Sequence, residues 1–285
     1  MPELPEVETV RRGLERRVTG RRIGPIEVLN PLVIRGEPDA FRDFLEGRRI
    51  GSVRRKGKTL AISLASNGSE AGHLMVRLGM TGQLVVSARH APILPHTHVR
   101  ISLGEDGEEL RFRDPRRFGM LRCCTACETQ RVFGALGPDA LEITSRQFQH
   151  TLRGRSGAIK GWLLNQRMLS GLGNIYADEA LFAARIHPKT PAGALSGTAA
   201  QALLLVVRRV LRRAVKLQGT SFRDYVDIEG HPGQFEPRLQ AYARTGLPCP
   251  RCGVTIRRVV VCGRSSHFCP ACQRPGRRGA RQAAQ

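Results

Sequence analysis

Four of the eight cysteines in this 285-residue sequence stand in two closely spaced pairs. Cys249 and Cys252 form the first pair, Cys269 and Cys272 form the second, and sixteen residues separate the two pairs. This spacing is typical of a structural zinc site, in which four thiolates leave no coordination position open. We therefore expect one zinc ion that holds a fold together, and no catalytic metal or organic cofactor.

The segment between the two pairs predicts a β-hairpin with Cys262, Gly263 and Arg264 at its tip. Cys262 is not needed as a ligand, because the other four cysteines already saturate the zinc site. Three more cysteines lack a second pair at a usable spacing and are expected to be buried or free thiols: Cys123, Cys124 and Cys127.

The N-terminus begins Pro2-Glu3-Leu4-Pro5-Glu6. On residue type alone, a proline at position 2 indicates the start of a helix and nothing catalytic. Glu6 lies one helical turn after Pro2, so it is either a charge that stabilises a helix N-terminus or a catalytic carboxylate. Side-chain amines that could act as nucleophiles are few, because the chain has only five lysines. A lysine side chain also has a pKa near about 10.4 unless it is buried.

The formal net charge of +22 comes mostly from arginine and is spread over the whole chain. Such a charge favours a polyanionic partner, and arginine forks suit bidentate phosphate contacts. A basic ribosomal protein or a membrane-surface protein would also fit the charge alone. The sequence has no apolar run of membrane-spanning length and no signal-peptide pattern, so we expect a cytoplasmic protein.

Two kinds of periodicity divide the chain and predict an α+β multidomain protein. Apolar residues at helical spacing predict an amphipathic helix over residues 5–18, and short β-branched runs then predict the antiparallel strands of a sandwich or barrel up to about residue 133. The expected strands are 26–34, 50–55, 59–64, 73–78, 83–87, 98–103, 109–113 and 119–122. The expected later helices are 145–153, 157–165, 174–184 and 196–217, and the last of them has a basic face that is expected to be solvated.

These elements predict five parts of the chain, namely a β-sandwich domain over 1–134, a linker over 135–144, a helical domain over 145–238, a zinc finger over 239–273 and a basic disordered tail over 274–285.

Six segments, in this order, resemble the formamidopyrimidine-DNA glycosylase family: MPELPEVETVRRGL, RRKGKTL, RLGMTG, DPRRFG, LLNQRMLSGLGNIYADEALF and GRSSHFCPACQ. The resemblance covers residues 1–273. It implies an N-terminal β-sandwich with a leading helix, then a helix–two-turns–helix domain and a zinc-finger hairpin. It also implies a bacterial bifunctional DNA glycosylase and abasic-site lyase, active as a monomer on duplex DNA with oxidised purines or abasic sites, and associated with the nucleoid through that DNA.

By this resemblance Pro2 is the nucleophile once Met1 is removed, since an α-amino group has a pKa near about 8 and is partly neutral in the cell. Attack on C1′ of the sugar would expel the base and leave an iminium ion that allows strand cleavage by β,δ-elimination. Glu3 is implied as the general acid. Lys58 is implied to contact phosphate and donate a proton in β-elimination, and Arg264 to assist δ-elimination.

The resemblance also implies the DNA contacts. Met80, Arg116 and Phe118 would fill the space left by an extruded base, although Met80 and Phe118 would otherwise be assigned to the core. Asn174 would contact a phosphate and cap its helix. Further DNA contacts fall on His96, Arg155 and Lys160. In the polar loop 219–237, Thr220, Ser221 and Tyr225 are candidates for reading the flipped purine.

The sequence departs from the family's pattern at two positions, and two alternative functions remain. Arg77 stands where the family usually has histidine, and Cys262 replaces a common glycine at the hairpin turn. A sister class resembling endonuclease VIII prefers oxidised pyrimidines, but its members tend to begin Pro-Glu-Gly-Pro rather than Pro2-Glu3-Leu4-Pro5. A non-enzymatic DNA-binding zinc protein would explain the charge and the cysteines but not this N-terminus.

Overall fold

The computed structural model describes residues 2–66 and 68–274. Their contacts divide them into two compact units. The first unit comprises residues up to Leu136 together with Arg213–Pro237, and the second comprises Gly137–Arg212 together with residues from Arg238 onward. Apart from Arg274, the expected disordered tail lies outside the described residues.

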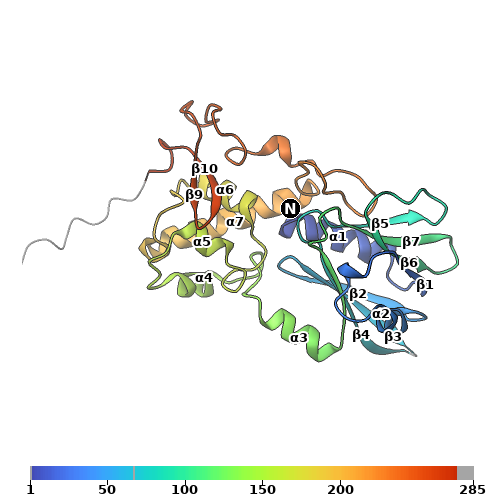
Figure 1. The fold of residues 1–285 in the computed structure, drawn as a ribbon. Coiled ribbons are helices and arrows are strands. Elements are labelled where there is room, and N and C mark those ends of the chain that lie inside the picture. The colour runs from blue at the N-terminus through green and yellow to red at the C-terminus, as the bar shows by residue number, and fades with distance from the viewer. Residues whose placement is uncertain (1, 67, 275–285) are drawn as a thin grey trace, which may run out of the picture. The chain divides into compact units, whose positions relative to one another are not determined.

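The first unit begins with helix α1, Leu4–Arg17 (Figure 1). Pro5 lies in its first turn, and Glu3 and Glu6 form a reciprocal capping box that closes its N-terminus. The expected apolar stripe is buried, with Val10 and Leu14 both fully inaccessible. The expected helix over 5–18 is therefore confirmed to within one residue at each end.

Two four-stranded antiparallel sheets follow α1 and enclose one apolar core. One has the strand order β1-β6-β7-β5 and the other the order β2-β3-β4-β8. The strand bounds are β1 Ile23–Val28, β2 Arg49–Lys56, β3 Thr59–Ser66, β4 Ser69–Arg77, β5 Gln83–Ala88, β6 Thr97–Leu103, β7 Glu108–Arg113 and β8 Met120–Cys124. This is the β-sandwich that the sequence predicted.

The first expected strand is too long. β1 ends at Val28, and residues Pro31–Val33 form a 3₁₀ turn, η1. The reason is local, because Pro31 has no backbone N–H and the Asn30 side chain accepts a hydrogen bond from Leu32 N at 3.0 Å. Two helices that the sequence analysis did not predict also belong to this unit, α2 Pro38–Leu45 and α3 Ala126–Gly134.

His73 on β4 is a buried titratable group, with 1% of its surface exposed. Its Nε2 lies 3.0 Å from a guanidinium nitrogen of Arg54. Burial lowers the pKa of His73, an effect that nearby Glu70 opposes and Arg54 reinforces. The folded state therefore holds this imidazole neutral over a range of pH where the unfolded chain takes up a proton.

This lowered pKa predicts a loss of stability in acid. An unfolded histidine has a pKa near about 6.5, so the contribution of His73 is complete above that pH and is lost as the pH falls below it. Melting temperatures measured from pH 8 to pH 5 are expected to fall less steeply for His73→Gln than for the unchanged protein. The melting temperature of His73→Gln should still fall somewhat with falling pH, because burial and Lys189 also lower the pKa of His187. Identical slopes for the two proteins would contradict this account.

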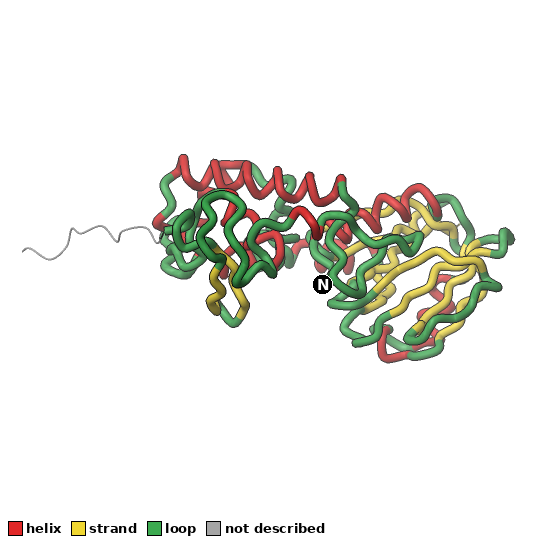
Figure 2. The backbone as a smooth tube through the Cα atoms, turned by 90° about the horizontal axis from the view of Figure 1, so that it is seen from above, coloured by secondary structure: helices red, strands yellow, loops and turns green. Residues whose placement is uncertain are grey.

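The described residues of the second unit form four helices and a two-stranded hairpin. The helices are α4 Ser145–Leu152, α5 Ile159–Leu164, α6 Asn174–Ala183 and α7 Gly197–Lys216, the end of which passes into the first unit. The hairpin pairs β9 Arg257–Val261 with β10 Arg264–Phe268, and short 3₁₀ turns occur at η2 Ala192–Ala194 and η3 Glu236–Arg238. Figure 2 shows the hairpin as two yellow strands joined by a short green turn.

α7 separates its apolar and basic residues as the sequence predicted. Leu204, Val207 and Leu211 are fully buried, whereas Arg209 and Arg212 are exposed. Its basic face is therefore open to solvent. Among the described residues, no helix has the length and apolar character needed to cross a membrane.

Candidate active site and nucleic-acid contacts

Pro2 and Glu3 are buried at the beginning of α1, and the carboxylate of Glu6 fixes the backbone beside them. One Glu6 oxygen accepts a hydrogen bond from Glu3 N at 2.7 Å, and the other accepts one from Thr220 N at 2.8 Å. Glu6 itself is 1% exposed. Of the two roles left open for Glu6, the structure shows a carboxylate that caps the helix and also ties a distant loop to the N-terminus.

The loop after α7 packs on the first turn of α1. Tyr225 is 5% exposed and its hydroxyl donates to Glu6 O at 3.4 Å. Gly219 has a φ of +86°, and a Cβ there would lie 2.7 Å from a Glu6 carboxylate oxygen. Burial raises the pKa of Tyr225, as does the Glu6 charge. The loop thus encloses Glu6 through backbone that has no room for a side chain at residue 219.

Lys58 lies at the tip of the β2–β3 hairpin, in the two-residue turn formed with Gly57. Arg55 supports this turn by donating to Gly57 O at 2.9 Å and to the Glu8 carboxylate on α1, also at 2.9 Å. Burial opposes ionisation of Glu8, but hydrogen bonds from Arg11, Arg55 and Arg12 outweigh it and lower its pKa. A charged Glu8 therefore links the Lys58 turn to the helix that carries Pro2.

The residues expected to fill the space of an extruded base lie on two loops of the first unit. Phe118 is 56% exposed, which excludes the core assignment that its residue type suggested. The Arg116 guanidinium stacks over the Phe118 ring at 4.7 Å. Met80 is half-buried in the turn after β4, and His96 is exposed with a φ of +67°. All four positions can therefore present side-chain atoms to a ligand.

Asn174 is the first residue of α6, and Gly173 occupies the N-cap position. The Oδ1 atom of Asn174 is buried and accepts no hydrogen bond from the described residues, so the expectation that Asn174 caps its own helix is wrong. The reason is position, since a capping side chain must stand one residue before the first helical residue. Arg155 lies in an exposed segment before α5, where a phosphate can reach its guanidinium.

Lys160 does not lie where a direct DNA contact would need it. Its side chain has no exposed surface, and its Nζ donates to Asp178 Oδ1 and to Ser265 O, both at 2.6 Å. Asp178 also accepts from Ser266 Oγ at 3.0 Å and from His267 N at 2.8 Å. The predicted phosphate contact is therefore corrected, because Lys160 anchors the β9–β10 hairpin to α5 and α6.

A second carboxylate of α6 holds the chain that leads into the cysteine module. Glu179 is 4% exposed and accepts hydrogen bonds from the backbone N–H groups of Gln240, Ala241 and Tyr242, at 2.8–3.1 Å. Burial raises the pKa of Glu179, although these hydrogen bonds act to lower it. The sequence analysis missed both Asp178 and Glu179, although adjacent acids on an otherwise apolar helix were a signal that could have found them.

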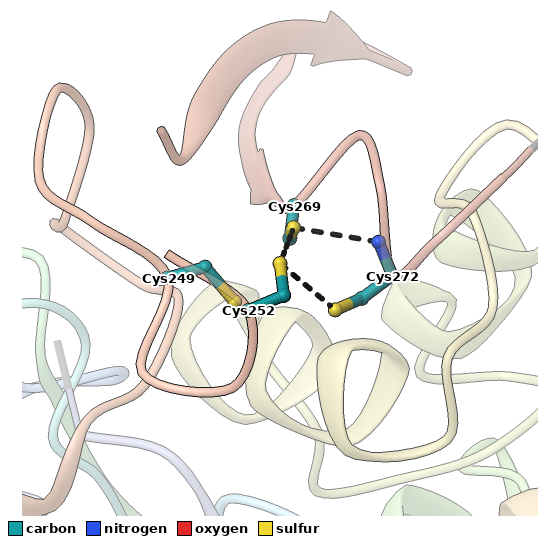
Figure 3. A group of neighbouring side chains, drawn as sticks. All are labelled: Cys249, Cys252, Cys269 and Cys272. Carbon is teal, nitrogen blue, oxygen red and sulfur yellow. Dashed lines mark hydrogen bonds between the residues drawn. The ribbon is translucent and has the colours of Figure 1, made fainter. Parts of the chain in front are cut away.

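The four predicted zinc ligands lie together (Figure 3). The Sγ atoms of Cys249, Cys252, Cys269 and Cys272 all lie within 4.8 Å of one another. Cys252 Sγ is 3.5 Å from Cys269 Sγ and 3.5 Å from Cys272 Sγ. Zn–S bonds of about 2.3 Å in a tetrahedron place sulfurs about 3.8 Å apart, so this donor set fits a four-thiolate zinc ion.

Arg264 directly follows the turn of the β9–β10 hairpin. The β9–β10 turn consists of Cys262 and Gly263, with φ values of +49° and +71°, so the two-residue turn persists although cysteine replaces glycine. Arg264 is exposed at the first position of β10. The Cys262 sulfur occupies the space beside Gly161, where a Cβ would lie 2.5 Å from it.

Cysteine alkylation is expected to distinguish three kinds of thiol. In the zinc-loaded native protein a thiol reagent should modify the exposed Cys127 and Cys262. Burial, together with Cys124, raises the pKa of Cys123 to about 12. Burial also raises the pKa of Cys124, so both thiols should stay unmodified. Chelation should release one zinc per chain and make the four ligands reactive. Intact-mass spectrometry reads this out, and native labelling of Cys123, or chelation that exposes no further thiols, would contradict the assignment.

Three family models match consecutive parts of the chain. They are the formamidopyrimidine-DNA glycosylase N-terminal domain over residues 1–121, the H2TH domain of the same glycosylases over residues 135–226, and a zinc finger found in FPG and IleRS over residues 246–275. They agree with the sandwich, the helical segments and the four-cysteine site described above. The module of residues 246–275 is therefore a zinc finger.

Similar proteins span almost the whole chain. The formamidopyrimidine-DNA glycosylase of Salinispora arenicola is 46% identical, over 98% of each chain, and that of Heliobacterium modesticaldum is 44% identical, over 96% of this chain and all of its own. A complex of the Lactococcus lactis FPG with DNA containing an abasic site superposes with a TM-score of 0.88, at 34% identity, over 96% of this chain and all of that one. The chain belongs to the formamidopyrimidine-DNA glycosylase family.

Proposed function

We propose that this chain excises oxidised purines, 8-oxoguanine and formamidopyrimidines, from duplex DNA and then cleaves the strand by β- and δ-elimination. The observation that carries the proposal is the N-terminus, where Glu6 holds the backbone of Glu3, directly after Pro2, by a 2.7 Å hydrogen bond. Family membership supports the substrate class, since similar Lactococcus lactis FPG complexes contain DNA with Fapy-dG or an abasic site.

Removal of Met1 would make Pro2 a secondary amine whose lone pair can attack C1′ of the damaged nucleotide. The C1′–N bond to the base then breaks, and the base leaves with a proton. Pro2 N gives up its own proton and forms a double bond to C1′, so the C1′–O4′ bond breaks and the ring oxygen takes a proton, for which Glu3 is the adjacent acid. The iminium ion draws electrons from the C2′–H bond, and the 3′ phosphate departs. We assign Lys58 to phosphate contact and proton donation in this step, and Arg264 to the later departure of the 5′ phosphate.

The remaining contacts divide between the two units, each taken by itself. In the first unit, Met80, Arg116 and Phe118 are proposed to fill the gap in the duplex, and His96 to contact the backbone. In the second unit, Arg155 and Asn174 are proposed to bind phosphates, with α6 contributing its N-terminal dipole. The net charge of +22 supports a polyanion of this kind.

We also propose that the protein works as a monomer in the bacterial cytoplasm, associated with the nucleoid through its DNA substrate. The bacterial sources of its relatives support a bacterial setting.

Borohydride trapping tests the proposal directly, because reduction of the iminium ion leaves a permanent protein–DNA bond. With a duplex carrying 8-oxoguanine opposite cytosine, borohydride is expected to give a one-to-one covalent adduct, and the same duplex with guanine should give none. No adduct on the lesion duplex would reject the amine mechanism. A greater yield on an oxidised pyrimidine than on 8-oxoguanine would move the enzyme to the pyrimidine class.

A further inference from the structure

Asp114 is a fully buried carboxylate that the proposed mechanism does not use. It directly follows β7 and has 0% exposed surface. A buried carboxylate is costly unless hydrogen bonds satisfy its oxygens. Asp114 Oδ2 accepts from Gly119 N at 2.6 Å, and Oδ1 accepts from Arg116 N at 3.2 Å and from the Thr81 hydroxyl. The carboxylate therefore joins the loop of residues 114–119 to the turn that follows β4.

The backbone of the same residue reaches a third segment. Asp114 N donates to His96 O at 3.0 Å, and Asp114 O lies 2.8 Å from His98 Nε2. His96 has a φ of +67°, a conformation that a non-glycine residue keeps only when its surroundings hold it. Asp114 thus holds His96, which is proposed to contact the DNA backbone.

The two loops meet through backbone that leaves no space for a side chain. Gly79 has a φ of +63°, and a Cβ there would lie 2.5 Å from the Phe118 carbonyl carbon. A Cβ at Gly119 would lie 3.0 Å from Asp114 Oδ2 and 2.7 Å from the Phe112 ring. This close approach fixes Met80, next to Gly79, relative to Phe118.

The side chains that these contacts position lie outside helices and strands, and all of them are exposed except Met80, which is half-buried. Arg116 and Phe118 stack on each other at 4.7 Å instead of packing into the core. An exposed loop that becomes ordered only on binding loses conformational entropy at that moment. A loop that is already ordered avoids this cost during base extrusion.

We propose that Asp114 is a positioning residue that pre-forms the group of Met80, His96, Arg116 and Phe118 for insertion into duplex DNA. The proposal rests on the function proposed above. Asp114 itself does not touch the DNA. It acts through four contacts, which are made with the Thr81 hydroxyl, the His96 carbonyl and the N–H groups of Arg116 and Gly119.

The test compares two substrates that differ in their need for base extrusion. Asp114→Asn keeps the side-chain volume, but its NH₂ group then faces an N–H or O–H group from which the carboxylate accepted a hydrogen bond. Excision of 8-oxoguanine from duplex DNA is expected to fall by roughly 10–100-fold, the loss that a misplacement of about 1 Å produces. Borohydride trapping on an abasic site in single-stranded DNA, which needs no extrusion, is expected to be unchanged.

Two further variants separate positioning from loss of stability. Leu103→Ala removes a fully buried side chain at the far end of β6, so it lowers the melting temperature without touching the loop. It is expected to show no selective loss on duplex DNA. Thr81→Val removes only one donor to Asp114, and it should give the selective loss in weaker form even if Asp114→Asn fails to fold.

The outcomes are distinct. If Asp114→Asn or Thr81→Val lowers activity equally on both substrates, Asp114 is merely structural and the inference is wrong. The inference is also wrong if neither variant loses duplex excision. If the unchanged protein forms no adduct on either substrate, the proposed function is rejected, and the positioning role with it. If the unchanged protein forms a normal adduct but the variants show no selective loss on duplex DNA, only the positioning role is rejected.

Discussion

A protein that retains Met1 or carries an N-terminal tag is expected to lose both base excision and borohydride trapping, while it still binds lesion DNA. Placing Pro2 N in a peptide bond removes its basic lone pair, and with it the proposed nucleophile. Loss of a nucleophile of this kind lowers turnover by roughly 10³-fold or more. Rates of 8-oxoguanine release and adduct yield give the measurement, and a C-terminal tag provides the matched control.

The few lysines make the result decisive. Lys160 is buried and bound to Asp178, and Lys58 is assigned to proton donation at the β2–β3 turn. Lys58→Ala is therefore expected to slow strand cleavage but still to form some adduct. Full excision and a normal adduct from the N-terminally tagged protein would instead identify an internal lysine as the nucleophile and overturn the mechanism.

The sequence predicted those elements that have a strong local signal. The helix over 5–18 has a long apolar stripe, and most strands alternate with glycine-rich turns. α2 was missed because Phe41 and Leu45 give it only two buried apolar positions. α3 was missed although the capping box of Thr125 and Glu128 is visible in the sequence, because the expected strand region extends to about residue 133.

Site residues were predictable where their chemistry is encoded by spacing. The cysteine pairs determine the zinc site, whereas the burial of Lys160 depends on Asp178, eighteen residues later, and on Ser265, one hundred and five residues later. Asp114 shows the same limit. It stands inside the recognisable segment DPRRFG, but its role depends on backbone N–H groups and on Thr81, which sequence spacing does not bring together.

Replacing Lys160 by methionine is expected to destabilise the second unit by about 3–5 kcal/mol, because it leaves the buried Asp178 carboxylate without its cation. The fit of the side chain is nearly kept, so lost packing contributes little. The hairpin should loosen with it, since Lys160 also donates to Ser265 O on β10. Denaturant unfolding gives the free energy, and chelator competition gives the rate of zinc loss, which should rise.

The matched control is Lys189→Met, the same substitution at an exposed lysine, which is expected to change stability by no more than about 0.5 kcal/mol. Adding Asp178→Asn to Lys160→Met should cost less than the sum of the two single changes, because each single change leaves a buried partner unsatisfied. Wild-type stability in Lys160→Met would show that the buried ion pair does not hold the hairpin. Reduced DNA affinity with unchanged stability and zinc retention would restore Lys160 as a direct phosphate contact.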